Sequence, residues 1–345
     1  MKKILVLGGT GAMGRYAVPE LLRLGFAVDV VALNKPMFNH ENLTSTIADA
    51  MDDIWLEKQL TETRYNVILD FMSYKLPQFK SRVQLFLDNT DQYMFLSSCR
   101  VYANEEVPVR ETSPRLLDVS KDEEYLSIRE SEYSLFKALE EDELVHSGKK
   151  NWTIILPATT YSTGRAQLVT LEAGTFVSRA FMGKPVVIPI QAKDKPATLS
   201  WAGDVGVMIA RLAGKAEALG EKFIVANSEH KTWGEIAEIY HELIGLEYEW
   251  VDKEIYLQIM SKERDKISPR IRYQLEYARL FDRITDNSKI LRITGMKQEE
   301  LTSFYDGMKK ELSDISIDDI RIDETRARVN QRMDEYFAKK TEGLK

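Results

Sequence analysis

The chain has 345 residues, which is long for a single hydrophobic core and favours one large domain or two unequal ones. Its net charge of −7 argues against a nucleic-acid-binding protein, because phosphate backbones repel acidic surfaces. No apolar run reaches the roughly 18 residues that a membrane-spanning helix needs, and the N-terminal apolar run is too short for a signal peptide. The single cysteine, Cys99, excludes an intrachain disulfide, so we expect a cytoplasmic enzyme or binding protein.

A glycine-rich turn opens the chain. The apolar run at residues 4–7 predicts a strand, and the apolar spacing over residues 15–24 predicts a helix. Between them stands Gly8-Gly9-Thr10-Gly11-Ala12-Met13-Gly14. Glycines in this position allow a tight turn and a close approach of the backbone to a pyrophosphate, and the helix N-terminus offers free N–H groups. We therefore predict that a dinucleotide binds here; the alternative is an ordinary strand-to-helix turn.

Alternating strand and helix patterns continue along the first half of the chain. Runs at residues 27–33, 43–49, 66–72, 92–98 and 152–157 predict strands; the run at 27–33 is mostly apolar and β-branched, as expected of a parallel strand covered on both faces. This alternation indicates an α/β fold, a Rossmann-type doubly wound parallel sheet, over residues 1–160. Residues 161–345 are less regular and predict a smaller mixed α/β substrate lobe, interleaved with the first domain because residues 203–226 are expected to pack on the sheet.

Polar residues at the ends of the predicted strands suggest how the dinucleotide is held. An Asp or Glu after the second strand would favour NAD, but Asn34 and Lys35 stand there, so we expect NADP in preference to NAD. Lys35 is alternatively a solvated loop lysine. Asp49 is placed to accept from an adenine amino group or to cap the following helix. Asp70 and Ser97 also fall at strand ends, where an open parallel sheet binds its ligands.

Three further residues form a candidate proton-transfer set. Tyr133 and Lys137 are four residues apart on a predicted helix spanning about residues 128–146, so they lie on one face. A nearby cation favours the phenolate form of a tyrosine and so makes it a better base. Ser98 ends the fifth predicted strand and is placed to bond the same substrate oxygen. The alternative for the Tyr–Lys pair alone is an ordinary helix surface.

Taken together, these motifs resemble the extended short-chain dehydrogenase/reductases, within the NAD-dependent epimerase/dehydratase family that acts on nucleotide-sugars. The motifs occur in the family's order: the glycine turn, Ser97-Ser98-x-x-Val101-Tyr102, Pro108-x-x-Glu111-x-x-Pro114, Tyr133-x-x-x-Lys137 and Leu156-Pro157. The opening is similar to a divergent subgroup related to atypical members and to chloroplast RNA-binding proteins. The resemblance implies that Tyr133 is the acid/base, that Lys137 holds the ribose and tunes Tyr133, that Ser98 bonds the substrate hydroxyl and that Asp49 contacts adenine.

Departures from the family pattern refine the expected reaction. Phe136, Leu156 and Thr159 replace the usual Ser, Arg and Asn, which widens the expected substrate to a nucleotide-sugar or a similarly sized carbonyl or alcohol. Cys99 and Arg100 replace the Asp-Glu pair of family dehydratases, so we expect an epimerase or carbonyl reductase rather than a 4,6-dehydratase. Cys99 is alternatively a proton donor or, in the more frequent case, a small packed apolar residue.

The complete expectation is an NAD(P)-dependent enzyme with Ser98, Tyr133 and Lys137 as its catalytic residues. The second hypothesis is an NAD(P)-binding regulatory or RNA-associated protein without turnover. We expect no metal site, because the four histidines lack ligand spacing, and we expect no nucleic-acid or membrane partner and a homodimer. The residues expected to bind the cofactor are Gly8, Thr10, Gly11, Ala12, Met13, Gly14, Asn34, Lys35, Asp49, Ala50, Phe71 and Pro157.

Overall fold

The computed structural model describes residues 1–36, 38–261, 266–313, 315 and 323–343. The chain forms two compact units, each built from more than one segment. Unit 1 consists of Met1–Thr160, Ser200–Ser228 and Thr285–Thr302. Unit 2 consists of Tyr161–Leu199, Glu229–Ile284 and Ser303–Lys345.

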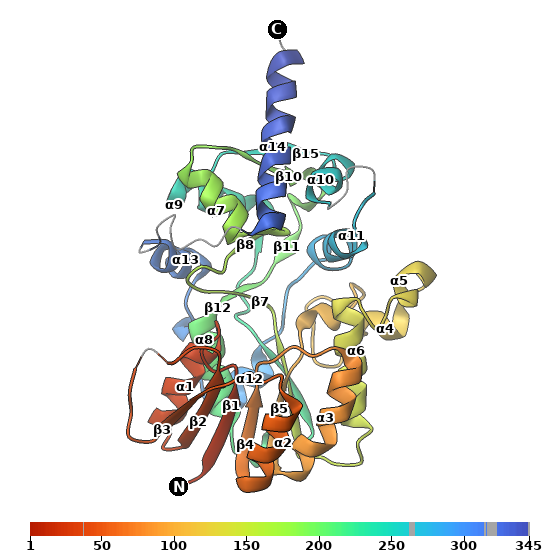
Figure 1. Cartoon of the computed structure of the whole chain (residues 1–345). Coiled ribbons are helices and arrows are strands. Elements are labelled where there is room, and N and C mark those ends of the chain that lie inside the picture. The colour runs from red at the N-terminus through yellow and green to blue at the C-terminus, as the bar shows by residue number, and fades with distance from the viewer. Residues whose placement is uncertain (37, 262–265, 314, 316–322, 344–345) are drawn as a thin grey trace. The chain divides into compact units, whose positions relative to one another are not determined.

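A seven-stranded sheet forms the centre of unit 1, with the strand order β13-β6-β5-β4-β1-β2-β3 (Figure 1). Every neighbouring pair is parallel, and the order steps outward in both directions from β1 and β4. This arrangement confirms the predicted Rossmann-type sheet. The strands are β1 (Lys3–Leu7), β2 (Ala27–Ala32), β3 (Leu43–Ile47), β4 (Tyr65–Asp70), β5 (Thr90–Leu96), β6 (Trp152–Pro157) and β13 (Glu221–Val225).

Helices lie on both faces of this sheet (Figure 1), and the inner strands are apolar on both sides. In β1, Ile4 and Val6 face one core while Leu5 and Leu7 face the other. The first core is covered by α1 (Gly14–Arg23), α8 (Ala202–Leu212) and α12 (Ser288–Thr294). The second is covered by α2 (Asp53–Glu62), α3 (Leu76–Asp88) and α6 (Tyr133–Val145).

Capping residues set the helix starts near the candidate site. Helix α6 begins at Tyr133, later than the predicted residue 128, because the Glu132 carboxylate accepts from the N–H groups of Ser134 and Leu135. The residues before it form two short helices, α4 (Leu116–Val119) and α5 (Glu123–Ser127). Helix α2 is capped by Asp52, whose carboxylate accepts from the N–H of Ile54 at 2.9 Å.

Unit 2 combines helices with two-residue to four-residue strands. Strand β10 (Val186–Pro189) pairs in parallel with β15 (Tyr248–Val251), and β8 (Gln167–Leu168) pairs with β9 (Leu171–Glu172) in antiparallel. Strand β11 (Pro196–Ala197) pairs in antiparallel with β14 (Lys231–Thr232). The principal helices are α7 (Ala173–Phe181), α9 (Trp233–Ile244), α10 (Lys253–Met260), α11 (Pro269–Gln274), α13 (Phe304–Ser313) and α14 (Glu324–Gly343).

One helical stretch of unit 2 changes its hydrogen-bond pattern along its length. Helix α11 ends at Gln274 and continues as a π-helical turn, Leu275–Arg279. Within the described part of the chain, no helix has the length and apolar character to cross a membrane.

Candidate functional site

The glycine turn between β1 and α1 can be built only from glycine at its tightest points. Gly8 has φ +76°, in the left-handed region, and its N–H donates to the carbonyl of Val31 at 2.8 Å. A Cβ on Gly14 would lie 2.6 Å from the carbonyl carbon and oxygen of Gly9, and a Cβ on Gly9 would lie 2.8 Å from Val30. The turn therefore brings α1 directly against β1, as a dinucleotide cradle requires.

The N-terminus of α1 is open at this turn. Among the described residues no side chain caps it, and its first turn carries no acidic residue. The Arg15 N–H already donates to Gly11 at 3.0 Å. Gly11 is exposed, Thr10 and Ala12 are half-buried, and the Met13 side chain packs into the apolar core. An anionic group at this end would meet N–H groups and the positive end of the helix dipole.

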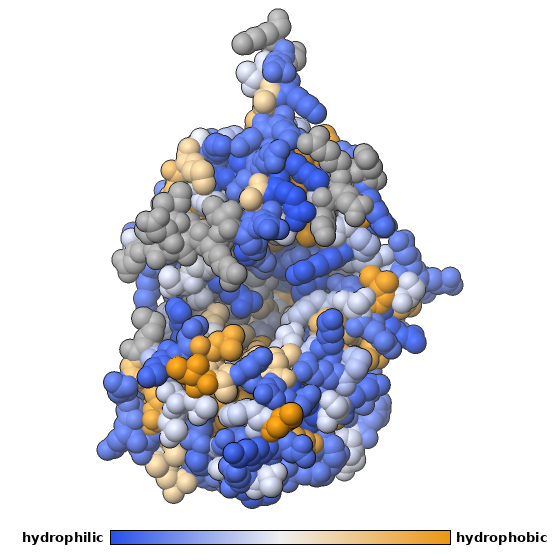
Figure 2. All heavy atoms as spheres, in the orientation of Figure 1, coloured by the Kyte–Doolittle hydropathy of each residue, from blue (hydrophilic) through white to orange (hydrophobic). Residues whose placement is uncertain are grey.

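The surface beside the ends of β2 and β3 joins cationic and apolar groups. Asn34 and Lys35, directly after β2, are exposed. Leu33 and Ile47, also at these strand ends, are 71% and 58% exposed. Figure 2 shows compact groups of apolar residues on the visible surface of unit 1, which is otherwise largely hydrophilic. An exposed apolar surface next to a lysine suits a flat aromatic ring that carries a phosphate nearby.

The remaining expected cofactor residues differ in their accessibility. Asp49 is exposed, and its carboxylate accepts from the Met51 N–H at 2.9 Å, while the helix cap considered for it is supplied by Asp52. Ala50 is buried, and its carbonyl accepts from Arg82 at 3.0 Å.

Phe71 and Pro157 follow or end strands of the sheet. Phe71 directly follows β4 and adjoins the glycine turn, since a Cβ on Gly8 would lie 3.4 Å from its Cβ. Pro157 is buried at the end of β6.

Ser97 and Ser98 have different environments although they are neighbours. The buried Ser97 hydroxyl donates to Glu141 at 2.5 Å. The Ser98 hydroxyl accepts from the Arg100 N–H at 3.2 Å and caps the turn Cys99–Val101. Cys99 is buried, with its Sγ 3.1 Å from the Leu156 carbonyl, so it packs into the interior. Of the two serines that follow β5, Ser97 donates its hydroxyl to a buried acid and Ser98 does not.

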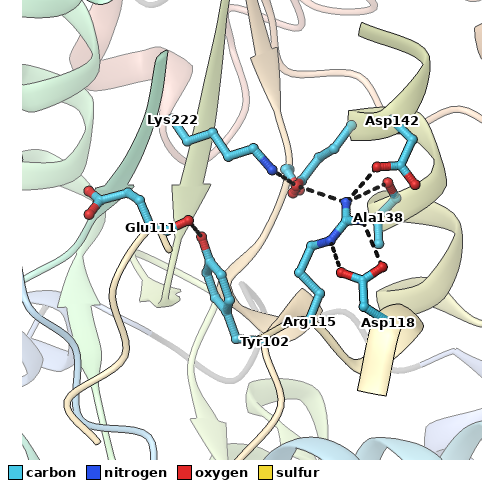
Figure 3. A network of polar contacts seen from close by, with 9 residues as sticks. Tyr102, Glu111, Arg115, Asp118, Ala138, Asp142 and Lys222 are labelled. Carbon is cyan, nitrogen blue, oxygen red and sulfur yellow. Dashed lines mark hydrogen bonds and ion pairs between the residues drawn. The ribbon is translucent and has the colours of Figure 1, made fainter. Parts of the chain in front are cut away.

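The acid that binds Ser97 belongs to a polar network between α6 and the edge of the sheet (Figure 3). Glu141 is fully buried and accepts from Lys222 at 2.7 Å, and the Arg115 guanidinium lies 3.6 Å away. Arg115 also pairs with Asp118 at 2.7 Å and Asp142 at 2.8 Å. Two cations, Lys222 and Arg115, thus surround the buried Glu141, and the Ser97 hydroxyl is engaged by this acid inside the network.

Glu111 of the Pro108-x-x-Glu111-x-x-Pro114 motif forms hydrogen bonds with strand β13 and with Tyr102. Its carboxylate accepts from the Ile224 N–H of β13 at 2.9 Å, and its carbonyl accepts from the Tyr102 hydroxyl at 3.2 Å (Figure 3). The motif therefore ties the long segment after β5 to the sheet.

Tyr133 occupies the first position of α6 and is half-buried. The Arg100 guanidinium lies over its ring, 4.9 Å from the centroid, and is also 3.2 Å from the Glu132 carboxylate. The Phe136 ring meets the Tyr133 ring edge-on at 5.5 Å. The arginine that replaces the dehydratase acid is thus stacked on the predicted acid/base, and Glu132 anchors it there.

Lys137 is directed into the interior. It is 1% exposed, its Nζ lies 2.8 Å from the Glu140 carboxylate, and the same Nζ lies 4.6 Å from the centre of the Phe95 ring. These contacts connect Lys137 to Glu140 rather than to Ser98 or Tyr133. Glu140 was not among the predicted site residues, although its position three residues after Lys137 places the two on one helix face.

Lys137 and Glu140 belong to a buried cluster that also contains Asp70. The Asp70 carboxylate accepts from the Tyr93 hydroxyl at 2.8 Å and the Met72 N–H at 2.9 Å. Burial raises the pKa of Asp70, and burial raises the pKa of Glu140 to about 7 against the opposing effect of Lys137. Asp70 therefore faces the interior and not the ligand edge where strand-end position alone had placed it.

No cluster of three or more histidine, cysteine, aspartate or glutamate side chains suitable for a metal ion occurs in the part of the chain that the structure describes.

Searched by sequence, the chain matches no family model, and no curated protein matches it either. Its structure is similar to the UDP-glucose 4-epimerase of Thermotoga maritima with UDP-glucose, at a TM-score of 0.64 and 17% identity over 90% of this chain and 97% of that one. It is also similar to the dTDP-glucose 4,6-dehydratase of Bacillus anthracis in complex with NAD, at a TM-score of 0.64 and 16% identity over 91% of this chain and 96% of that one. A third similar structure is the UDP-glucose 4-epimerase of Thermus thermophilus in complex with NAD, at a TM-score of 0.61 and 17% identity over 92% of this chain and 98% of that one. The chain has the fold of these enzymes. The predicted resemblance to the epimerase/dehydratase family is confirmed at the level of the fold.

Proposed function

We propose that the chain is a nicotinamide-dinucleotide-dependent enzyme, an epimerase or carbonyl reductase for a nucleotide-sugar or a similarly sized alcohol or carbonyl. The observation that carries the proposal is the glycine turn closed against the uncapped N-terminus of α1. A turn with glycine at its tightest points and with free N–H groups fits a pyrophosphate, which needs both close backbone approach and hydrogen-bond donors. The epimerases and the dehydratase of the same fold have NAD in two of the structures described above.

The half-buried Tyr133 is the proposed acid/base. When bound, the nicotinamide ring would supply the acceptor or donor of a hydride. Tyr133 takes the proton from the hydroxyl group on the carbinol carbon, and Ser98 donates to or accepts from the same oxygen to orient it. In the reverse direction Tyr133 returns the proton to the carbonyl oxygen. The Arg100 guanidinium, stacked on the ring at 4.9 Å from its centroid, holds the Tyr133 ring at the start of α6.

We also propose a preference for NADP over NAD. Lys35 is exposed directly after β2, and no carboxylate occupies that position or the preceding one, Asn34. A 2′-phosphate at the end of β2 would therefore meet a cation and no opposing acid. The exposed Arg15 in the first turn of α1 adds a second cation near the same end of the sheet.

The test has two stages. Titration of the chain with NADH and NADPH, followed by their fluorescence, should show saturable binding with the tighter constant for NADPH. A panel of nucleotide-sugars and alcohols is then offered with each oxidised dinucleotide. Replacement of Tyr133→Phe is expected to abolish turnover and to change dinucleotide affinity by less than about twofold, since the hydroxyl acts on the substrate. Retained turnover in Tyr133→Phe would refute the assigned role.

A second candidate function is a dinucleotide-binding protein without turnover. The specific observation in its favour is that Lys137 is buried against Glu140 instead of contacting Tyr133. Such a protein would bind NADH or NADPH with the affinities expected above, and the bound dinucleotide would remain unchanged with every member of the substrate panel.

A further inference from the structure

The Lys137 ammonium is buried without a complete set of partners. Among the described residues, Lys137 Nζ and both carboxylate oxygens of Glu140 lack a hydrogen bond, although Nζ and Oε2 are only 2.8 Å apart. Lys137 and Glu140 therefore form an ion pair whose geometry is not that of a hydrogen bond. Buried polar groups are nearly always hydrogen-bonded, so a buried ammonium whose N–H groups lack acceptors indicates that an additional acceptor binds it.

We propose that Glu140 is a positioning residue that holds the Lys137 ammonium inside unit 1 and yields it to the ribose hydroxyls of a bound dinucleotide. This inference rests on the proposed dinucleotide site. Glu140 and Lys137 lie on consecutive turns of α6, and the Phe95 ring of β5 closes the other side of Nζ at 4.6 Å. The Lys137 side chain can therefore either contact Glu140, one turn further along the helix, or extend toward the C-terminal ends of the sheet strands. Phe95 marks this direction, because it lies one residue before the end of β5.

The charge balance of the cluster makes the competition depend on protonation. Asp70 and Glu140 are two buried acids that share one buried cation, Lys137, so the fully ionised cluster carries an excess negative charge in an apolar interior. Burial raises the pKa of Glu140 to about 7, so near neutral pH this carboxylate gains or loses its proton. Protonation removes its attraction for Lys137 and leaves the ammonium available to another acceptor.

Other titratable groups around this pair come from α6, from the strands beneath it and from the segment that leads to α3. Their charges act on the protonation of Glu140 directly or through Asp70. These groups are Lys137 and Glu141 of α6, Asp70 of β4, Tyr93 of β5, Tyr74 and, beyond it, Arg82 of α3.

Binding of NADH as a function of pH tests the proposal, because NADH lacks the 2′-phosphate that itself titrates near pH 6. For the wild-type chain we expect affinity to fall up to about tenfold between pH 6 and pH 8, as a group with a pKa of about 7 ionises. In Glu140→Gln the affinity should match the wild-type value at pH 6 or exceed it and should stay flat across this range. The control Glu143→Gln alters an acid of the same helix whose side chain is 36% exposed and pairs with Lys80, and it should follow the wild-type curve.

A second variant keeps the proposal falsifiable if Glu140→Gln does not fold. Lys137→Met removes the cation for which Glu140 and the ribose hydroxyls compete, and it should both weaken NADH binding and remove the pH dependence. The proposal is overturned if Glu140→Gln and wild type share one pH profile, or if Lys137→Met keeps the wild-type profile. If wild type binds neither NADH nor NADPH, the proposed function fails together with this inference, whereas normal binding with unchanged profiles removes the role of Glu140 alone.

Discussion

Substitution of Gly14→Ala tests the packing of the glycine turn and its proposed ligand together. The added Cβ would lie 2.6 Å from the Gly9 carbonyl, whereas ordinary van der Waals contact begins at 3.4 Å. Helix α1 would have to move by the difference, 3.4 − 2.6 = 0.8 Å, away from β1. That movement is opposed by α8, because Gly206 of α8 already approaches α1 so closely that a Cβ there would lie 2.8 Å from Tyr16.

We expect overpacking of this kind to lower the free energy of unfolding by about 1–3 kcal/mol. The higher helix propensity of alanine, about 1 kcal/mol, offsets part of this loss. Urea denaturation followed by circular dichroism should show a lower midpoint with an unchanged slope. NADH affinity should fall more than about tenfold, since the N–H groups at the start of α1 are displaced from the pyrophosphate.

Gly11→Ala is the matched comparison. A Cβ on Gly11 meets a single neighbour, the Gly8 carbonyl at 3.2 Å, so a shift of a few tenths of an ångström accommodates it. We expect near-normal stability in this variant but weakened NADH binding, because Gly11 is the exposed glycine of the turn. If Gly14→Ala unfolds at the wild-type urea concentration and binds NADH normally, the packing argument and the assigned ligand position are both wrong.

The remaining predictions concern one binding residue and one structural acid. Lys35→Ala should weaken NADPH binding about three- to fivefold, as expected for one exposed ion pair, and leave NADH binding unchanged; equal losses for both dinucleotides would contradict the role of Lys35 at a 2′-phosphate. Glu141→Ala should lower the free energy of unfolding by about 1–3 kcal/mol, because it leaves the Lys222 ammonium and the buried Ser97 hydroxyl without their acceptor. Glu143→Ala, which removes an acid of the same helix whose side chain is 36% exposed, should cost less than about 0.5 kcal/mol, and comparable losses in the two variants would refute the importance of burial.

The architecture of unit 1 was readable from sequence because it rests on local patterns. Apolar runs such as residues 4–7 produce strands buried on both faces, and the glycine turn has few alternatives between a strand and a helix. Helix starts were less accurate, since the Glu132 cap that begins α6 at Tyr133 uses a glutamate where Ser, Thr, Asp or Asn is the usual signal.

Side-chain direction at the site was the part that sequence could not supply. Asp70 and Ser97 stand at strand ends, yet each turns inward because its partner comes from a distant segment, Tyr93 for Asp70 and Glu141 for Ser97. Such pairings depend on strand register and helix packing, which no local pattern encodes. The sequence does not distinguish Glu140 for a different reason: an acid within an otherwise ordinary helix sequence is normally solvated, and only the structure shows that Glu140 is completely buried and paired with Lys137.

The contact between Glu111 and Ile224 has a consequence for the chain's behaviour at high concentration. Strand β13 is the last strand on its side of the sheet, and an outermost strand offers unused N–H groups to any passing polypeptide. The Glu111 carboxylate occupies one of these groups at 2.9 Å and sets a negative charge beside it. A second sheet that approached β13 would have to displace this acid before it could add a strand, so the motif protects the protein against strand-to-strand aggregation.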